Sequence, residues 1–101
     1  MIIVAGWVKV PAADRETYLQ ERRQKILWVR TRPGCEEYNL TLDPIEDGKV
    51  RIFEVWESKE AQRAKERDED KREPAPVYTV RVKDRSITEY EVAAADVHHS
   101  A

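Results

Sequence analysis

The segment from Arg32 to Ala61 restricts the fold of this chain more than any other part of the sequence. It begins with Pro33 and Gly34, which end a helix because proline cannot continue one and glycine readily adopts the closing conformation. Two runs of alternating polar and apolar residues follow and predict two strands joined by a turn. Ser58, a favourable N-cap residue, then predicts the start of a second helix. The segment therefore predicts a helix, two strands and a helix, in that order.

The two central strands form an expected hairpin. Tyr38, Leu40 and Leu42 alternate with polar residues in the first strand, and residues 49–57 form the second. Residues 43–48 contain Asp-Pro and Asp-Gly pairs, which are typical of turns.

The N-terminal strand is apolar on both faces. Within residues 2–10, one parity carries Ile2, Val4, Val8 and Val10, and the other carries Ile3, Ala5 and Trp7. An antiparallel strand with one wet face alternates cleanly, so this pattern predicts a sheet that is covered on both sides.

A first helix is expected from an N-cap at Asp14 to about Arg32. Its core-facing stripe consists of Tyr18, Leu19, Arg22, Ile26 and Val29. The second helix, within residues 57–73, is almost entirely charged, and only Ala61 and Ala64 are expected to face a core. Residues 77–82 alternate like a strand without an evident role, and residues 87–92 predict the last strand.

This order of elements predicts an α+β fold, a ferredoxin-like split β-α-β sandwich with a four-stranded antiparallel sheet and both helices on one face. The predicted domain covers residues 1–92, and residues 93–101 form an expected flexible tail. Because the other face is also apolar, we expect a homodimer that buries the two sheet faces against each other.

Composition excludes several classes of protein. The chain has 101 residues, and 18 Lys and Arg against 20 Asp and Glu give a net charge of -2, so nucleic acid is not expected as a partner. A single cysteine is consistent with the reducing cytoplasm. The apolar N-terminus is interrupted at Lys9, so neither a membrane span nor a signal peptide is expected.

Two motifs carry a resemblance to a known family. The Pro33-Gly34-Cys35 turn and the strand-to-helix junction from Glu54 to Ala61, which reads Glu-Val-Trp-Glu-Ser-Lys-Glu-Ala, resemble the antibiotic biosynthesis monooxygenase family of dimeric α+β barrels. The resemblance covers roughly residues 1–64, with a looser match at 87–92. It implies substrate binding inside each subunit, between sheet and helices.

Four aromatic residues are candidates for substrate binding: Trp7, Tyr38, Phe53 and Trp56. An indole at the end of the third strand can stack on a flat polycyclic or quinol substrate. The alternative is that these side chains only fill a thin core.

Glu54 is the main catalytic candidate, because a carboxylate inside an apolar strand has a raised pKa unless a partner stabilises its charge, and such groups act as general bases. Tyr18 is the second candidate for handling a proton. The alternative for Glu54 is a structural ion pair with Arg22 or Arg51.

Metal and cofactor sites are not expected. His98 and His99 are adjacent in the tail rather than spaced for chelation, and Cys35 is followed by two glutamates that disfavour a thiolate. Three separated glycines provide no phosphate cradle. Many relatives have a histidine where this chain has Lys65, and the asparagine of haem-degrading relatives is also missing, which makes haem degradation a minor alternative.

The leading hypothesis is a cofactor-independent monooxygenase that acts on an aromatic, polyketide-like or quinol small molecule. A phenol that loses its proton can pass an electron to dioxygen unaided, so the protein need supply only an apolar pocket, a base and a hydrogen bond to the anion. The alternatives are a non-catalytic dimeric small-molecule-binding or accessory protein, and a structural role in a biosynthetic complex.

Overall fold

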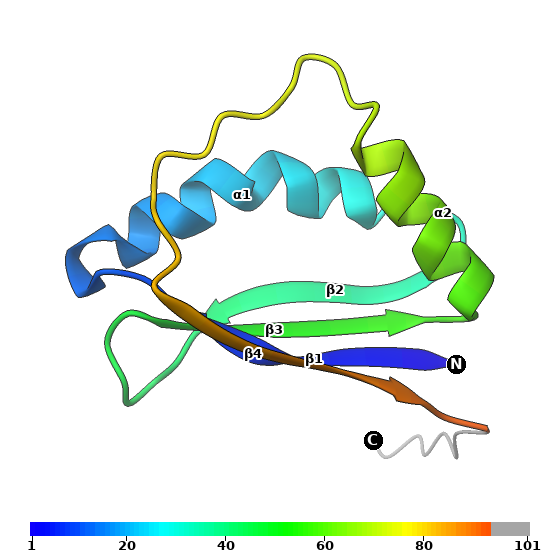
Figure 1. Ribbon diagram of the computed structural model, residues 1–101, viewed down its shortest axis with the longest axis horizontal. Coiled ribbons are helices and arrows are strands. Elements are labelled where there is room, and N and C mark those ends of the chain that lie inside the picture. Colours follow the sequence, from blue (N-terminus) through cyan, green and yellow to red (C-terminus); the bar gives the residue numbers. More distant parts are fainter. Residues whose placement is uncertain (94–101) are drawn as a thin grey trace, which may run out of the picture.

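The computed structural model describes residues 1–93. Its elements are β1 (Ile2–Lys9), the short 3-10 helix η1 (Ala12–Asp14), α1 (Arg15–Val29), β2 (Cys35–Leu42), β3 (Lys49–Trp56), α2 (Lys59–Glu69) and β4 (Asp84–Glu91). The four strands form one antiparallel sheet in the order β2-β3-β1-β4, and both helices lie on the same side of it (Figure 1). The expected α+β ferredoxin-like fold is confirmed.

The covered face of the sheet is built from the even-numbered residues of β1 and β3. Val4 packs in a buried cluster with Val29 at the end of α1, and Val8 packs in a second cluster with Tyr18 near the start of that helix. Because side chains alternate along a strand, the odd-numbered residues point to the opposite face. No helix of the described chain covers that outer face (Figure 1).

The two helices start differently. The Ser58 hydroxyl accepts a hydrogen bond from the backbone N–H of Ala61 at 3.1 Å, which confirms the predicted N-cap of α2. The Asp14 side chain makes no such bond, so its predicted capping role is wrong. The turn of η1 precedes α1 and places Asp14 in a different backbone conformation from that of a capped start.

The buried face of α2 also differs from expectation. Gln62 and Lys65 are its buried residues, while Ala61 is only partly buried and packs at the edge of the core. The long aliphatic stem of lysine lets it cover apolar surface, so a charged residue occupies a core-facing position of this helix.

Residues 70–83, here called the crossing segment, run from α2 over α1 to β4 without regular structure (Figure 1). Both carboxylate oxygens of Glu21 on α1 accept hydrogen bonds from it, from the N–H and hydroxyl of Thr79 and from the N–H of Val80. Val80 and Val82 pack against the cluster around Val8. The strand-like alternation of residues 77–82 thus marks a segment that covers the core without joining the sheet.

Candidate functional site

Three predicted site residues meet on the covered face of the sheet. Tyr38 of β2 is paired in register with Glu54 of β3, and Trp56 follows two residues later on the same face. All three are buried, and Trp56 is fully inaccessible. Tyr38 and Trp56 belong to one packed cluster with residues of β1 and α1, so here the two aromatic side chains form part of the core.

The Glu54 carboxylate is paired with an indole. Trp56 Nε1 donates a hydrogen bond to Glu54 Oε1 at 3.0 Å, and both groups are buried. Within residues 1–93, no lysine or arginine forms an ion pair with Glu54. The hydrogen-bond partner of this buried carboxylate is thus a neutral donor.

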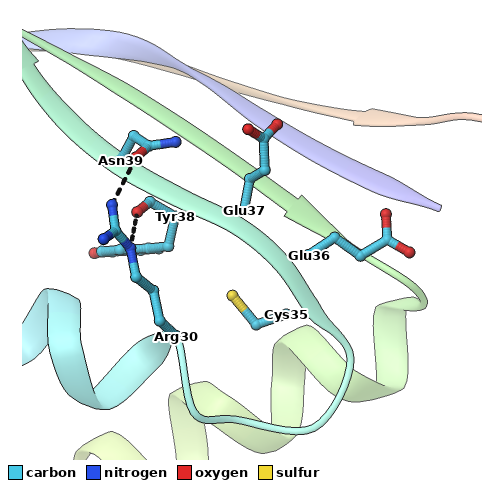
Figure 2. A pocket seen from close by; sticks show the side chains of 6 residues that line it. All are labelled: Arg30, Cys35, Glu36, Glu37, Tyr38 and Asn39. Atoms are coloured by element: carbon cyan, nitrogen blue, oxygen red, sulfur yellow. Dashed lines mark hydrogen bonds between the residues drawn. The ribbon is translucent and has the colours of Figure 1, made fainter. Parts of the chain in front are cut away.

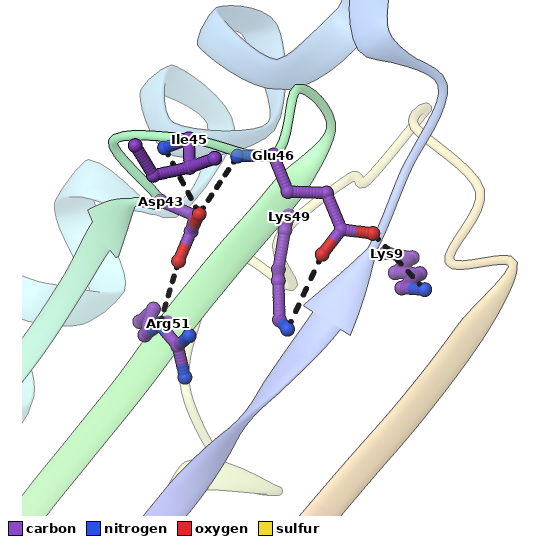
Figure 3. A network of polar contacts seen from close by, with 6 residues as sticks. All are labelled: Lys9, Asp43, Ile45, Glu46, Lys49 and Arg51. Carbon is purple, nitrogen blue, oxygen red and sulfur yellow. Dashed lines mark hydrogen bonds and ion pairs between the residues drawn. The ribbon is translucent and has the colours of Figure 1, made fainter.

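The expected ion pair of Glu54 with Arg22 or Arg51 is wrong. Arg51 Nε instead binds Asp43 Oδ1 at 2.8 Å, on the turn between β2 and β3 (Figure 3). The Arg22 guanidinium is stacked between two rings, 3.6 Å from the centroid of Tyr18 and 4.3 Å from that of Tyr78. Arg51 does not pair with Glu54 because side chains alternate along β3, and residues 51 and 54 point to opposite faces of the sheet.

Lys65 belongs to the same cluster and was not among the predicted site residues. Its ammonium lies 6.0 Å from the centroid of the Tyr38 ring and 5.9 Å from that of Trp56. Glu69 Oε1 is 3.6 Å away, and the other Glu69 oxygen binds Lys25 of α1 at 3.1 Å. The sequence signal was its position one helical turn after Ala61, which places both on one face of α2.

Burial and nearby charge affect the hydroxyl and thiol of this cluster. Burial raises the pKa of the Tyr38 hydroxyl above its usual range, and the Glu54 and Glu69 carboxylates raise it further. Burial also raises the pKa of the Cys35 thiol, again with a contribution from Glu54. Both groups are therefore protonated at neutral pH and are poor nucleophiles.

A surface hollow of about 320 Å³ lies along β2, the edge strand of the sheet, beside Cys35 and Tyr38 (Figure 2). Arg30 crosses it, with Nε donating to the backbone oxygen of Tyr38 at 3.0 Å and a terminal nitrogen donating to Asn39 Oδ1 at 2.7 Å. Arg30 thereby occupies backbone and side-chain acceptors of the edge strand.

Tyr18 lies in the other cluster of the core, with Val8, Val10 and Val50. Burial raises the pKa of its hydroxyl, partly offset by the stacked Arg22 guanidinium. The structure does not bring Tyr18 into the cluster that contains Glu54.

Trp7 and Phe53 lie on the outer face of the sheet, opposite Tyr38 and Trp56. Phe53 pairs in register with Ala5, and Trp7 with Arg51. The ammonium groups of Lys9 and Lys49 each lie 5.1 Å from the Trp7 ring centroid, and Glu46 binds both lysines at 3.2 and 3.3 Å (Figure 3). The four predicted aromatic residues therefore do not line one pocket within a single subunit.

Comparison with known families places this chain. The family model described as antibiotic biosynthesis monooxygenase matches residues 1–70. The chain belongs to the antibiotic biosynthesis monooxygenase family. An uncharacterised protein from Synechocystis is 35% identical over 60 residues, which cover 59% of this chain and 41% of that protein. The match thus spans about two fifths of the length of this curated relative.

Solved structures share the fold of this family member. A candidate antibiotic biosynthesis monooxygenase from Deinococcus radiodurans superposes with a TM-score of 0.72 at 20% identity, covering 99% of this chain and 100% of that one. The haem-degrading protein MhuD from Mycobacterium tuberculosis, solved with two haems in its active site, gives 0.72 at 18% identity over 94% and 98% of the chains. These TM-scores show a common fold.

Two features of the described residues bear on metal ions and membranes. Within residues 1–93, no group of three or more His, Cys, Asp and Glu side chains is arranged to hold a metal ion. His98 and His99 lie outside that range. None of the helices in this part of the chain has the length and apolar character needed to cross a bilayer.

Proposed function

We propose that this protein is a cofactor-independent monooxygenase that oxidises an aromatic, polyketide-like or quinol small molecule. The observation that supports it is the buried Glu54 carboxylate, which is held by the Trp56 indole and has no cationic partner among residues 1–93. The pair lies on the helix-covered side of the sheet in a member of a monooxygenase family.

In the proposed mechanism, Glu54 accepts the proton of a phenol or of an activated methylene. The resulting anion passes an electron to dioxygen, and the two radicals combine to give a hydroperoxide. Loss of water converts a methylene into a carbonyl, so one oxygen atom enters the product and the other leaves as water. The substrate supplies all electrons, and Trp56 keeps the base oriented. Tyr18, in the other cluster, stays the second candidate for handling a proton.

Oxygen uptake with a panel of hydroquinones and anthrones tests this proposal. Glu54→Gln removes the base and is expected to lower kcat about 10²- to 10⁴-fold. Glu60→Gln, at an exposed position in the first turn of α2, is the matched control. The proposal is overturned if no substrate of the panel stimulates oxygen uptake, or if Glu54→Gln retains full activity.

The second candidate is a non-catalytic dimeric protein that binds or delivers a small molecule. The observation in its favour is that α2 contains no histidine and has Lys65 where many relatives have one, so this helix offers no imidazole for proton transfer. This function predicts that aromatic ligands raise the melting temperature without oxygen uptake.

Haem degradation is the minor alternative, and the residues present fit haem poorly. Lys65 is engaged by Glu69 and two aromatic rings, and the fully buried Trp56 occupies the adjacent interior. An ammonium group carries no lone pair for iron.

We also propose that the protein forms a homodimer through the outer sheet faces. The outer face carries Ile3, Ala5, Trp7, Phe53, Val55 and Tyr90. Phe53 is 39% exposed and Tyr90 is 52% exposed, so a single subunit leaves large apolar side chains of this face in contact with water. A twofold axis places this surface against its own copy.

A further inference from the structure

A second hollow of about 270 Å³ lies between α2 and the turn that connects α1 to β2. Gly34, which has no side chain, and the small residues Ala61 and Ala64 form part of its wall, and Arg32 and Lys65 contribute cations. A cavity of about 150 Å³ is large enough for benzene. The hollow is therefore large enough for one substituted aromatic ring.

The two cations of this hollow have unused hydrogen-bonding capacity. Arg32 Nε is buried and has no hydrogen-bond partner among residues 1–93. Lys65 is 8% exposed, and its one carboxylate neighbour, Glu69, is 3.6 Å away and is shared with Lys25. Buried donors are nearly always satisfied, so this pair favours a bound acceptor.

The hollow also contains two carboxylates, those of Glu57 and Asp68. Both residues are exposed, whereas Lys65 is buried and Arg32 is partly buried. Solvent and salt screen exposed charges more than buried ones. The lining thus carries equal numbers of cations and carboxylates, and the cations are its more buried and less screened charges.

We propose that this hollow binds a single-ring phenol as its phenolate, with Lys65 holding the anionic oxygen and Arg32 acting as a second donor. This inference rests on the proposed function and specifies its substrate class. The Lys65 ammonium lies 5.9 Å from the centroid of the Trp56 ring, and the Trp56 indole binds Glu54, so Lys65 links the wall of the hollow to the residues that hold the proposed base. Lys65 is then a residue that selects acidic phenols, because a cation stabilises the charged form of its ligand.

The test uses para-nitrophenol, whose phenolate has its own absorption band. Binding is measured across a pH series by difference absorbance with the full-length protein. The wild type is expected to bind the phenolate at least about tenfold more tightly than the neutral phenol, which lowers the pKa of the bound phenol by about one unit. Lys65→Met is expected to remove this preference, and Lys65→Arg to retain it.

Lys59→Met is the matched control, because Lys59 is exposed on the first turn of the same helix. Arg32→Gln replaces the cation with a neutral polar side chain and is expected to weaken phenolate binding. This variant is the alternative test if Lys65→Met does not fold. The inference is overturned if the bound phenol keeps its solution pKa in the wild type, or if Lys65→Met and Arg32→Gln both bind the phenolate like the wild type. Tighter binding of benzoate than of the phenolate also overturns the assignment to phenols.

These outcomes separate the inference from the proposed function. If the pKa of bound nitrophenol is lowered in a way that depends on Lys65, and no substrate stimulates oxygen uptake, phenolate binding in the hollow is supported and the monooxygenase function is rejected. If oxygen uptake depends on Glu54 and the protein shows no preference for the phenolate, the monooxygenase function is supported and phenolate binding in the hollow is rejected.

Discussion

The Trp56 indole N–H and the Glu54 carboxylate oxygen lie 3.0 Å apart on the covered face of β3. Residues two apart in a strand point the same way, so this bond needs no other element to bring its partners together. It fixes the orientation of the one carboxylate that the sheet buries beneath the helices. The same bond affects how much stability the protein loses when Trp56 or Glu54 is substituted.

Trp56→Phe is expected to destabilise the protein by about 3 kcal/mol or more, because it removes packing volume and leaves a buried carboxylate without its donor. Urea unfolding at neutral pH measures the loss. Trp28→Phe is the matched control, since the Trp28 indole is only partly buried and donates no hydrogen bond within residues 1–93.

A double-mutant cycle with Glu54→Leu isolates the bond itself. The double variant is expected to lose about 1 to 3 kcal/mol less than the sum of the single variants, because no carboxylate then remains unpaired. Additive losses would show that the bond contributes nothing beyond packing.

Gly34 shows how tightly the turn after α1 fits α2. Its φ of 82° is unfavourable for other residues, and an added Cβ would lie 2.5 Å from Cβ of Ala61. Gly34→Ala is expected to destabilise the fold by about 2 to 4 kcal/mol, from backbone strain of about 1 to 2 kcal/mol and steric overlap. Ala61→Gly in the same chain is expected to relieve the overlap but not the strain. Equal stability of Gly34→Ala and the wild type in urea would contradict this.

The sequence predicts the order of elements because several boundaries have a local cause, although the start of α1 at Asp14 does not follow the predicted cap. Ser58 caps α2 through the N–H of Ala61, and Pro33 and Gly34 lie in the turn that follows the end of α1 at Val29. Such features are encoded within a few residues, and they suffice for the sheet and its helices.

The sequence does not predict which aromatic residues share a pocket. Both parities of β1 are apolar, so periodicity alone leaves open whether Val4 or Trp7 faces the helices. Tertiary packing decides it, and it separates Trp7 and Phe53 from Tyr38 and Trp56. The sequence also does not predict that Lys65 is buried, because a charged residue is normally expected to be exposed.

The crossing segment depends on Glu21. The N–H of Thr79 is the main cause that holds the pKa of this carboxyl below its usual range, and the Thr79 hydroxyl and the Val80 N–H add to it. Glu21→Gln is expected to speed amide hydrogen exchange of residues 77–82 on the order of tenfold, the scale of one net hydrogen bond. Glu16→Gln, on the same helix, is the control.

The same contact has a pH dependence of known sign. Because the pKa of Glu21 is lower in the folded state, Glu21 contributes its full stabilisation above the usual carboxyl pKa. This stabilisation is lost as pH falls through the folded-state pKa. Exchange in residues 77–82 is therefore expected to accelerate in acid, relative to other exposed amides, in the wild type but not in Glu21→Gln. Identical acid profiles for the two proteins would reject this role.

Asp43 organises the turn between β2 and β3 (Figure 3). The backbone N–H groups of Glu46 and Ile45 and the Arg51 side chain lower its pKa from 3.8 to about 2. A lowered folded pKa stabilises the protein above about pH 4, and this stability disappears as pH falls toward 2.

Asp43→Asn is accordingly expected to lower the urea midpoint at pH 7 and to have little effect near pH 2. Asp47→Asn, in the same turn but without a hydrogen bond or ion pair among the described residues, is the control. A loss of stability in Asp43→Asn that is independent of pH would assign the effect to amide geometry rather than to charge.

Phe53 tests the proposed dimer, because it lies near the centre of the outer face, beside Ala5 of β1. Phe53→Glu places an unpaired charge in that interface, which typically opposes burial by about 3 to 5 kcal/mol. The dimer dissociation constant is expected to rise by roughly a hundredfold or more. Ile45→Glu, in the turn at an 89% exposed position, is the control for a new charge at an apolar residue. Light scattering and sedimentation equilibrium at micromolar concentration measure the change, with circular dichroism to confirm folding. A wild-type monomer under these conditions, or a Phe53→Glu dimer as tight as the wild type, would exclude the outer sheet face as the interface.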